Sequence, residues 1–444
     1  MYQQSKRNFW FLAVVCLLAL PNKIQAMAQE SLALDNDSTS ITTNKRGNCS
    51  PCLSRTTFVP RQPGTDQTLE LTLTNYFLYH TQVPCRPIVF LSATPFYEQT
   101  TRDCDFGRYF LPDHKRSVTF EGNRLSIRPE RRVYGALLYA QLDLEFLRPG
   151  TWLSINVTPL RVEHTLNLHA DDATREELGS SNLKYGAVTN CKLTRTRIDD
   201  ILVKFGFNVW QNDCAHVDFY SVFTFPTGKC RNARYLFEPT VGTVHYSSGF
   251  GLNADYILWN KGQQSLTIMG DANYRYSIAE DERRSFDFCH YGEWSRFLPV
   301  SKAGSSTTQP AINLFSPCVR VEPRSFVELW TALHYQYCNW AFEAGYDLWY
   351  RENERVYLRN NCRARKDLVI YDQADLLGCS TTPNTTTSTQ VIDGDLNLCS
   401  AAAPQVITHK VFAAASYNYN WHTIPTMLGL GGSYEFSKHH GSRG

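Results

Sequence analysis

The sequence has no strong charge of either sign and few charged residues. Among its 444 residues, 44 Lys and Arg stand against 42 Asp and Glu, which gives a formal net charge of +2. Charged residues make up 19% of the chain, below the roughly 25% of a typical soluble domain. A balanced chain has neither the basic surface that binds nucleic acid nor the acidic surface that attracts a cationic partner. We therefore expect no nucleic-acid partner.

Long apolar runs are missing beyond the N-terminus. The N-terminus itself combines the basic residues Lys6 and Arg7, a short apolar stretch over residues 9–20 and the small-residue motif Ala26-Met27-Ala28. This pattern predicts a cleaved signal peptide over residues 1–28. No later run reaches the about 18 apolar residues of a membrane helix. This excludes membrane helices from the mature chain but not membrane strands, in which only alternate residues are apolar.

Motifs for nucleotide binding, zinc proteolysis, serine hydrolysis and calcium binding are also missing. Four polar neighbours that could suggest a catalytic group fit a solvated loop better: His164, His169, Asp171 and Asp172. The pair His439 and His440 fits a disordered C-terminal tail, residues 437–444, better than a metal site. The sequence thus predicts no enzyme activity, no cofactor and no metal.

Cysteine, by contrast, is plentiful. The chain has 14 cysteines, and loss of Cys16 with the signal peptide leaves an odd number. Cysteines of exported proteins are usually oxidised to disulfides. Because the number is odd, at least one thiol is free or paired between chains. Cys49 and Cys52 form a CxxC pair in a polar segment, where a structural disulfide is favoured over a redox or zinc role.

The main positive signal is a period of two. Residues 29–66 are polar and predict a disordered segment. From residue 67 onward, apolar and polar residues alternate, as in the last segment, where Leu428, Leu430, Tyr434 and Phe436 share one face. The alternation predicts strands at 69–79, 87–97, 117–127, 137–146, 151–168, 200–210, 216–226, 241–259, 265–276, 325–337, 342–351, 406–419 and 426–436. Residues 169–198, 280–324 and 352–405 predict long loops, some of them stapled by disulfides.

The length of these strands favours a membrane barrel. Most runs reach the roughly 9 to 11 residues that a tilted membrane strand needs. Tyr and Phe gather near the ends of the apolar faces, as in aromatic girdles. The opposite faces carry charges that a dry core could not accept without partners but that a water-filled lumen could. We expect these side chains to line the lumen: Arg275, Glu328, Glu343, Asp347 and Lys410.

The fold class expected is therefore all-β, an antiparallel transmembrane β-barrel of about 12 to 14 strands over residues 67–436. The strand number should be even, because both chain ends of such a bacterial barrel lie in the periplasm. Strand parity then places the loops 280–324 and 352–405 on the periplasmic side. The alternative is a secreted β-sandwich with the charged face in solvent.

The last strand, Gly432-Ser-Tyr-Glu-Phe436, resembles the terminal signal of Gram-negative outer-membrane proteins, from which it departs by the eight residues that follow. The segments Ile198-Asp-Asp200 and Phe223-Thr-Phe-Pro-Thr-Gly228 resemble porin and FadL-like channels. Residues 284–300 resemble uncharacterised outer-membrane proteins of host-dependent bacteria. The resemblance implies the outer membrane as location, its lipid bilayer as surroundings, and recognition by the assembly machinery through Tyr434–Phe436.

These observations predict a porin-like channel for passive diffusion of small solutes. Because the expected lumen carries both signs of charge, it should select by size more than by charge. A surface-exposed structural or adhesive barrel with disulfide-bonded loops is the alternative, and the odd cysteine favours it. An outer-membrane enzyme is a third and weaker hypothesis.

Overall fold

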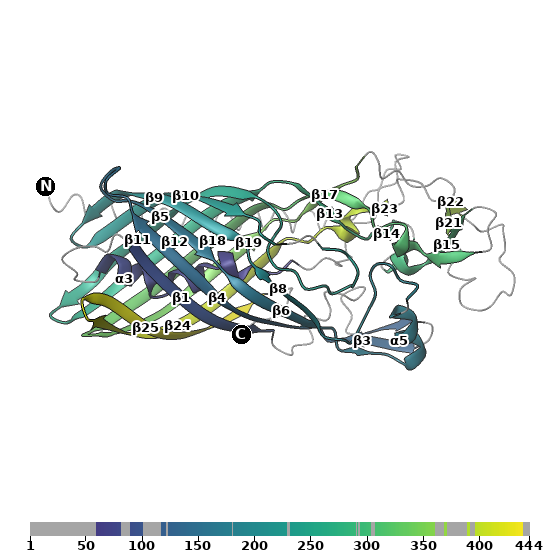
Figure 1. Ribbon diagram of the computed structural model, residues 1–444, viewed down its shortest axis with the longest axis horizontal. Coiled ribbons are helices and arrows are strands. Elements are labelled where there is room, and N and C mark those ends of the chain that lie inside the picture. Colours follow the sequence, from purple (N-terminus) through teal and green to yellow (C-terminus); the bar gives the residue numbers. More distant parts are fainter. Residues whose placement is uncertain are drawn as a thin grey trace, which may run out of the picture. The chain divides into compact units, whose positions relative to one another are not determined.

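The computed structural model describes residues 59–80, 89–100, 117–120, 123–179, 181–228, 231–289, 291, 294–302, 307–359, 368–370, 389–390 and 396–437. The predicted signal peptide, the CxxC pair and the His439–His440 tail lie outside these residues. Most of the described chain forms antiparallel strands (Figure 1). No described helix is long and apolar enough to cross a membrane.

One large sheet dominates the described chain, and all of its neighbouring strands are antiparallel. It contains thirteen strand segments, and the prediction of an antiparallel all-β barrel is confirmed. The strands are β1 (Val89–Gln99), β4 (Glu130–Asp143), β5 (Thr151–Val157), β6 (Pro159–Thr165), β8 (Leu193–Ile198), β9 (Ile201–Asn212), β10 (Ala215–Phe225), β11 (Ser247–Lys261), β12 (Gln264–Ser277), β18 (Arg324–Tyr337), β19 (Trp340–Arg351), β24 (Val406–Trp421) and β25 (Ile424–Phe436).

Two strands of the sheet are continuations of others. β4 pairs along its length first with β6 and then with β5, which are separated only by Thr158. Likewise, β8 and β9 are separated by Asp199 and Asp200. Eleven strands therefore stand side by side, from β25 through to β1, which pairs with β4. The described sheet does not have the even number that we expected.

The two edges of the sheet come together around an interior. Between β25 and β1 the described residues form no backbone ladder. Met427 of β25 nevertheless packs against the cluster that contains Phe90 of β1. Since ten antiparallel steps separate β1 from β25, the two strands run in the same direction where they meet.

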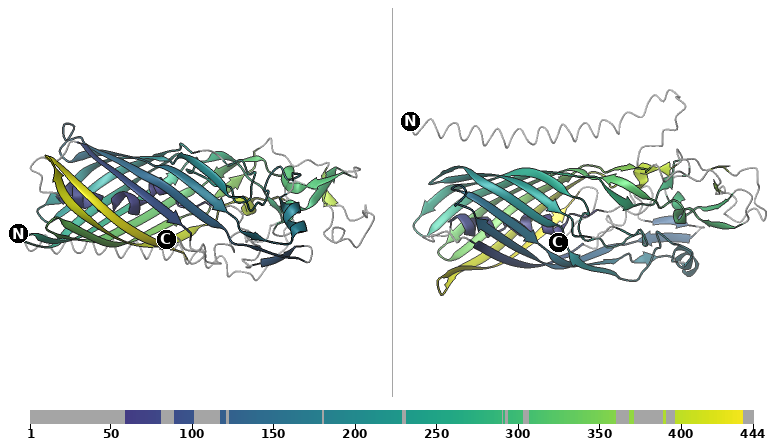
Figure 2. Two further views of the ribbon diagram at one scale, coloured as in Figure 1. Left: turned by 60° about the horizontal axis from the view of Figure 1, so that its bottom comes forward. Right: turned by 45° about the horizontal axis from the view of Figure 1, so that its top comes forward.

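Short hairpins join the strands at one end of the sheet and long loops join them at the other (Figures 1 and 2). The long loops form small sheets, one with β2 (Ser117–Phe120), β3 (Asn123–Ile127) and β7 (Leu168–His169), and one with β13 (Glu280–Arg283), β17 (Cys318–Glu322) and β20 (Arg355–Tyr357). Two more contain β14 (Asp287–Phe288) and β23 (Leu396–Asn397), and β15 (Pro299–Lys302), β16 (Thr308–Pro310), β21 (Leu368–Ile370) and β22 (Thr389–Gln390).

Four short helices complete the loop end: α5 (Asp172–Leu178), η3 (Ser295–Phe297), η4 (Ala311–Asn313) and η6 (Leu398–Ala401). Apolar side chains from loops far apart in sequence pack there into one cluster, which includes Phe286, Val300, Val319 and Leu396. The loops 280–324 and 352–405 therefore share a small apolar core where described.

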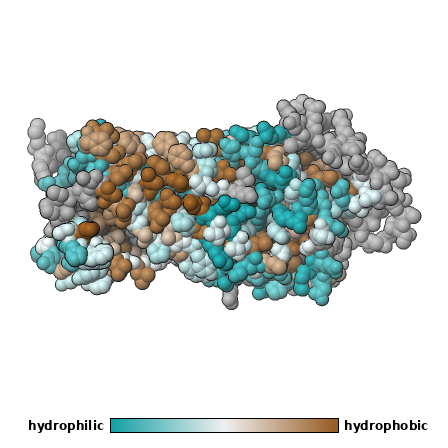
Figure 3. Space-filling view, in the orientation of Figure 1, coloured by the Kyte–Doolittle hydropathy of each residue, from teal (hydrophilic) through white to brown (hydrophobic). Residues whose placement is uncertain are grey.

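The main sheet has polar side chains inside and apolar ones outside. On β12, the inward Thr267, Asp271 and Asn273 are buried, whereas the outward Ile268 and Tyr276 are exposed. Outward apolar side chains recur around the sheet, among them Leu91, Leu138, Phe205, Phe223, Leu252, Leu333, Phe342, Val411 and Leu430. Figure 3 shows hydrophobic side chains gathered over the sheet and hydrophilic ones nearer the long loops. The predicted alternation is thus found in the three-dimensional structure.

The prediction of a strand at residues 69–79 is wrong. This part of the chain forms α2 (Gln67–Leu71) and α3 (Thr74–His80), preceded by the turn η1 (Pro63–Thr65). Asp66 caps α2 by accepting a hydrogen bond from the backbone N–H of Thr68, at 3.0 Å. Leu73, at φ 62°, turns the chain between the helices. Residues 59–66, expected to be disordered, are ordered and mostly buried here.

A glycine tests the packing of the sheet. A Cβ added at Gly249 of β11 would collide with the backbone oxygen of Tyr274 on β12, which cannot move without breaking the ladder. We expect Gly249→Ala to destabilise the folded chain by about 1–3 kcal/mol. Gly432→Ala is the matched control, because nothing lies within 4 Å of its added Cβ. Thermal unfolding in detergent measures both, and equal stability of the two variants would contradict the packing described.

Candidate functional site

The interior of the main sheet is occupied by residues 59–80, which we call the interior segment. It begins beside the long loops, where Val59 accepts a hydrogen bond from Arg351 at 3.2 Å. It ends near the hairpins, where the hydroxyl of Tyr79 donates to Asp218 at 3.2 Å. Its helices are enclosed by strands in the views of Figures 1 and 2. The segment therefore crosses the length of the interior.

All five side chains predicted to line the lumen are buried around this segment. Four of them contact the segment directly, and the fifth, Arg275, lies beside Glu328, which contacts it. They come from four strands: Arg275 on β12, Glu328 on β18, Glu343 and Asp347 on β19, and Lys410 on β24. Each is at most 5% exposed. The structure brings them together in one interior, as the alternation implies, but that interior is filled by protein rather than by open water.

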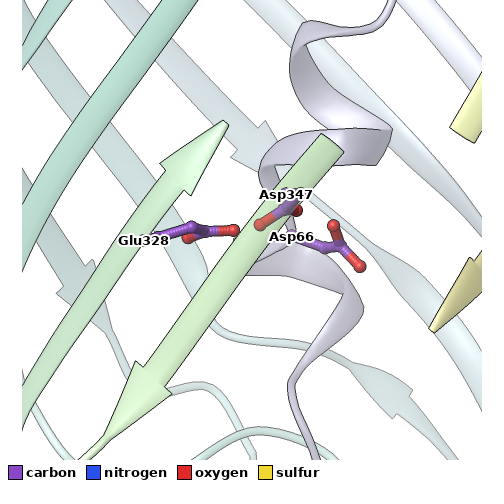
Figure 4. Close-up of side chains that lie close together, drawn as sticks. All are labelled: Asp66, Glu328 and Asp347. Carbon is purple, nitrogen blue, oxygen red and sulfur yellow. The ribbon is translucent and has the colours of Figure 1, made fainter. Parts of the chain in front are cut away.

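The strands of the main sheet form a wall around the interior segment. Arg61 of the segment lies between two strands of this wall. Its Nη2 donates to Oδ2 of Asp347 at 2.7 Å and to Oε1 of Glu328. The carboxylates of Asp66 and Glu435 lie at 3.5 Å and 3.8 Å. Figure 4 shows Asp66, Glu328 and Asp347 converging from the segment and from two strands. The positive guanidinium compensates carboxylates that burial would otherwise penalise.

The segment also supplies negative charge to the lysines of the wall. Asp66 forms an ion pair with Lys410, and Glu70 forms one with Lys204 of β9. Both lysines are at most 5% exposed. The charges of the segment thus complement those of the wall. The guanidinium of the segment contacts carboxylates of the wall, and the carboxylates of the segment contact lysines of the wall.

Uncharged groups complete the fit along the segment. The backbone N–H groups of Gln67 and Leu73 donate to Glu328 at 3.0 Å and to Glu343 at 2.9 Å. Thr68 donates its hydroxyl proton to Asp347 at 2.7 Å. Nearer the hairpins, Tyr76 stacks on His334 with ring centroids 3.6 Å apart, and Tyr79 lies 4.4 Å from His216. Together with the ion pairs to β9, β24 and β25, these contacts to β10, β18 and β19 reach six strands of the wall.

Little space remains around the segment. Three cavities that adjoin it have volumes of about 20, 30 and 30 Å³. Each has room for about one to three water molecules, because a single water needs roughly 10–15 Å³ on this measure. None of these three cavities could hold a solute much larger than water.

The cluster of Asp66, Glu328 and Asp347 has the separation of a metal site. One carboxylate oxygen from each lies within 4.8 Å of the others. The guanidinium of Arg61 already binds two of these carboxylates, so the cluster has a cation of its own. The donor set is satisfied by Arg61, and we assign no metal to it.

Arg61, Asp66 and Glu70 were missed at the level of the sequence. Arg61 and Asp66 lie in a polar stretch that is typical of disorder, and Glu70 lies in the segment 69–79 that was predicted as a strand. The one available signal was local, since Asp66 directly precedes a run of helix-compatible residues with Glu70 in its first turn. Nothing in that signal says what the helix contacts.

The polar group at residues 164–172 has structural roles. His164 packs on Phe237, with ring centroids 4.0 Å apart, and Asp171 caps α5 through Thr174 at 2.9 Å. His169 is exposed, and Asp172 pairs with Arg175 on the surface. The absence of enzyme activity stays a prediction. Cys191, Cys214 and Cys338 have free, exposed thiols, and the disulfide-stapled loops also stay a prediction.

A charged network lies at the loop end. Nε2 of His245 is 2.8 Å from Glu282, and its Nδ1 is 3.0 Å from the carbonyl of Ile278. Arg284 bridges Glu282 at 3.0 Å and Glu354 at 3.3 Å. Burial alone would lower the pKa of His245, but the hydrogen bond and charge of Glu282 raise it above its ordinary value. Burial would raise the pKa of Glu282, yet Arg284 and His245 hold it well below its usual range.

The chain was compared with known families, curated proteins and solved structures. No family model and no curated protein matches the chain. Among solved structures, it is similar to an outer membrane channel from Pseudomonas putida F1, with 12% identity, TM-score 0.38, and 80% of this chain and 93% of that one covered. It is also similar to the translocator domain of autotransporter NalP from Neisseria meningitidis, with 11% identity, TM-score 0.32 and coverage of 85% and 91%.

A third similarity is to BamA from Haemophilus ducreyi lacking POTRA domains 1–3, with 10% identity, TM-score 0.21 and coverage of 73% and 58%. By fold, the chain is an antiparallel β-barrel. The strand order and registers of the chain itself show this fold, and they confirm the fold that the sequence resemblance to outer-membrane β-barrels implied.

The His245 network predicts a pH dependence. Because the pKa of His245 is raised in the folded chain, the stability that its charged ring contributes is fully present below about pH 6.5 and is lost as the pH rises through the folded pKa. We expect the melting temperature to fall over that window in the natural chain and to change less in His245→Gln. His169→Gln, at an exposed site, should keep the natural profile. Identical profiles for all three chains would disprove this role of His245.

Proposed function

We propose that the chain is an outer-membrane channel for small polar solutes and that the interior segment closes it in the described state. The observation that supports this most is the pairing of a charged wall with a separate, complementary segment of the same chain. A wall built only to be a protein core would be apolar, because buried ion pairs contribute little net stability. Charged side chains facing inward are expected where a lumen takes up water.

The outer face supports the membrane part of the proposal. Exposed Leu, Phe and Val side chains recur on the outward positions of the strands, and lipid is the surroundings that such a face requires. Strands satisfy their backbone groups within the sheet, as a span through lipid demands. Tyr434 and Phe436 lie on this outward face of the last strand, where the assembly machinery would meet them.

The dimensions suit a gate for small solutes. An eight-stranded barrel is filled by its own side chains, whereas a wider wall leaves internal space. Here that space holds the helices α2 and α3, and a helix with its side chains is roughly 10–12 Å across. Departure of the segment would leave an opening of about that width. The helices have five and seven residues, too few to be stable alone in water.

A structural or adhesive barrel remains the second candidate. The filled interior favours it equally, because a barrel whose interior segment never leaves would be closed to solutes. In that case the exposed thiols of Cys191, Cys214 and Cys338 would offer sites for crosslinking.

Conductance separates the two candidates. Asp66→Asn together with Glu70→Gln removes the negative partners of Lys410 and Lys204, and breaking a buried pair costs about 3–5 kcal/mol. We expect at least a roughly hundredfold greater open fraction in planar bilayers, since about 2.7 kcal/mol corresponds to that factor. Asp172→Asn is the control, because its side chain is 98% exposed. Folding of each variant is checked by heat-modifiable gel mobility. Correctly folded variants that show no steps would favour the structural candidate.

The sidedness of the channel follows from the path of the chain. Val59 and Phe436 both lie at the end that carries the long loops, as the contacts of Val59 with Arg351 and of β25 with the start of β24 show. If the exported N-terminal segment stays in the periplasm, the long loops face the periplasm and the short hairpins face outward. We propose this orientation, which reverses the usual placing of short turns in the periplasm.

Free thiols at the two ends test the orientation. Cys214 and Cys338 lie at hairpins and Cys191 lies in a long loop. On intact cells, we expect a membrane-impermeant maleimide to label the natural chain and Cys191→Ser, and to label the double variant Cys214→Ser/Cys338→Ser much less. Undiminished labelling of the double variant Cys214→Ser/Cys338→Ser would instead place the long loops on the outside.

A further inference from the structure

Two neighbouring strands of the wall present a pair of carboxylates to the same point of the interior. Glu328 of β18 and Asp347 of β19 are fully buried and both bind Nη2 of Arg61. We infer that Glu328 and Asp347 form a binding site for small organic cations of the guanidinium or amine type, which Arg61 occupies as a built-in ligand in the closed state. This inference rests on the proposed channel function and names the class of solute that the lumen accepts.

The ligand that points to this site comes from outside the wall. Arg61 precedes η1 and belongs to the interior segment, so its guanidinium enters the wall as a separate group would. Charge-assisted hydrogen bonds to carboxylates are the strong class of such contacts, and guanidinium is the side-chain group best suited to them.

The tethered guanidinium uses only part of its capacity. Nη2 makes the hydrogen bonds to the wall, whereas the buried Nε and Nη1 of Arg61 have no hydrogen-bond partner. Oδ1 of Asp347 also accepts none. A guanidinium carries five N–H donors in a rigid fork. A free cation, released from the backbone of residue 61, could turn to bring more donors onto these carboxylates.

The surrounding wall favours cations as a class. On strands β9, β10, β11, β12, β18, β19, β24 and β25, the buried carboxylates are Asp218, Asp255, Asp271, Glu328, Glu343, Asp347 and Glu435, and the buried bases are Lys204, Arg275, Arg351 and Lys410. Seven against four leaves an excess of three negative charges, with the histidines counted as neutral. Rings of acidic side chains select cations. This inference replaces the sequence-based expectation that the lumen selects by size more than by charge.

Hydrated metal ions fit the site less well than an organic cation. Asp66, the third carboxylate of the cluster, belongs to the interior segment and would leave with it. Two carboxylates then remain, fewer than the six to eight oxygen ligands of a calcium site. Glu328 also keeps Arg275 as a neighbour at 3.3 Å, which opposes a divalent ion more than a single positive charge.

Chemical rescue tests the site without any measurement of transport. Arg61→Ala removes the built-in ligand and leaves the two carboxylates without it, so we expect a lower melting temperature in detergent. Millimolar methylguanidinium chloride should restore most of the lost melting temperature, whereas sodium chloride at the same ionic strength should not. The matched control is the triple variant Arg61→Ala/Glu328→Gln/Asp347→Asn, which should gain nothing from methylguanidinium. Equal effects of the two salts, or equal gains in both variants, would overturn the site.

Bilayer recordings supply a second, independent measurement. Arg61→Ala is added to Asp66→Asn/Glu70→Gln to open the channel. In a potassium chloride gradient, the reversal potential should then lie closer to the equilibrium potential of potassium than to that of chloride. Methylguanidinium should block the current, and Asp347→Asn should weaken the block at least roughly tenfold, the factor of about 1.4 kcal/mol. An open channel without cation preference and without block overturns the site and leaves the channel.

The two measurements also separate the site from the proposed function. Thermal rescue without conductance would establish the cation site and overturn the channel. If Arg61→Ala folds neither alone nor when methylguanidinium is present during refolding, the rescue has failed and counts against the site.

Discussion

The structure depends on one constraint: charged side chains that face the interior of the barrel must have partners. Seven carboxylates and four bases point inward from eight strands, and water does not reach them in the described state. Burying such groups unpaired would cost several kcal/mol each. The interior segment supplies Arg61, Asp66 and Glu70 at the places where the wall has unmatched charge. Its course through the interior follows from that complementarity.

The same segment explains the odd number of strands. Eleven strands stand side by side, yet Val59 and Phe436 emerge at the same end. The interior segment crosses the length of the barrel once before β1 begins near the hairpins, so the described residues make an even number of crossings. We expected an even number of strands because both chain ends should lie on one side. The number of crossings is even as expected, but one crossing is the helical interior segment, so the number of strands is odd.

What the sequence could reveal is set by how many sides of a segment are buried. A wall strand has one apolar and one polar side, so its alternation is visible in β12 or β19 without any knowledge of its neighbours. The interior segment contacts the wall on every side, and its buried residues include Leu71, Leu73 and Tyr76 together with Gln67 and Glu70. In a segment surrounded in this way periodicity does not report the structure, and the alternation over residues 69–79 predicted a strand where α2 and α3 form. The inward position of Glu328 and Asp347 could be predicted, but the partner that they bind could not.

Filling the interior through ion pairs has a physical consequence that an apolar filling would lack. An apolar plug leaves behind an apolar wall, and exposing that wall to water is penalised in proportion to its area. A charged wall exchanges its protein partners for water and ions, so the cost of opening is limited to the difference between two favourable states. Buried pairs contribute modestly to net stability but fix one arrangement, because every misplaced charge is expensive. The charged interior of this barrel therefore fixes the segment in a single closed arrangement, and it can take up water once the segment has left.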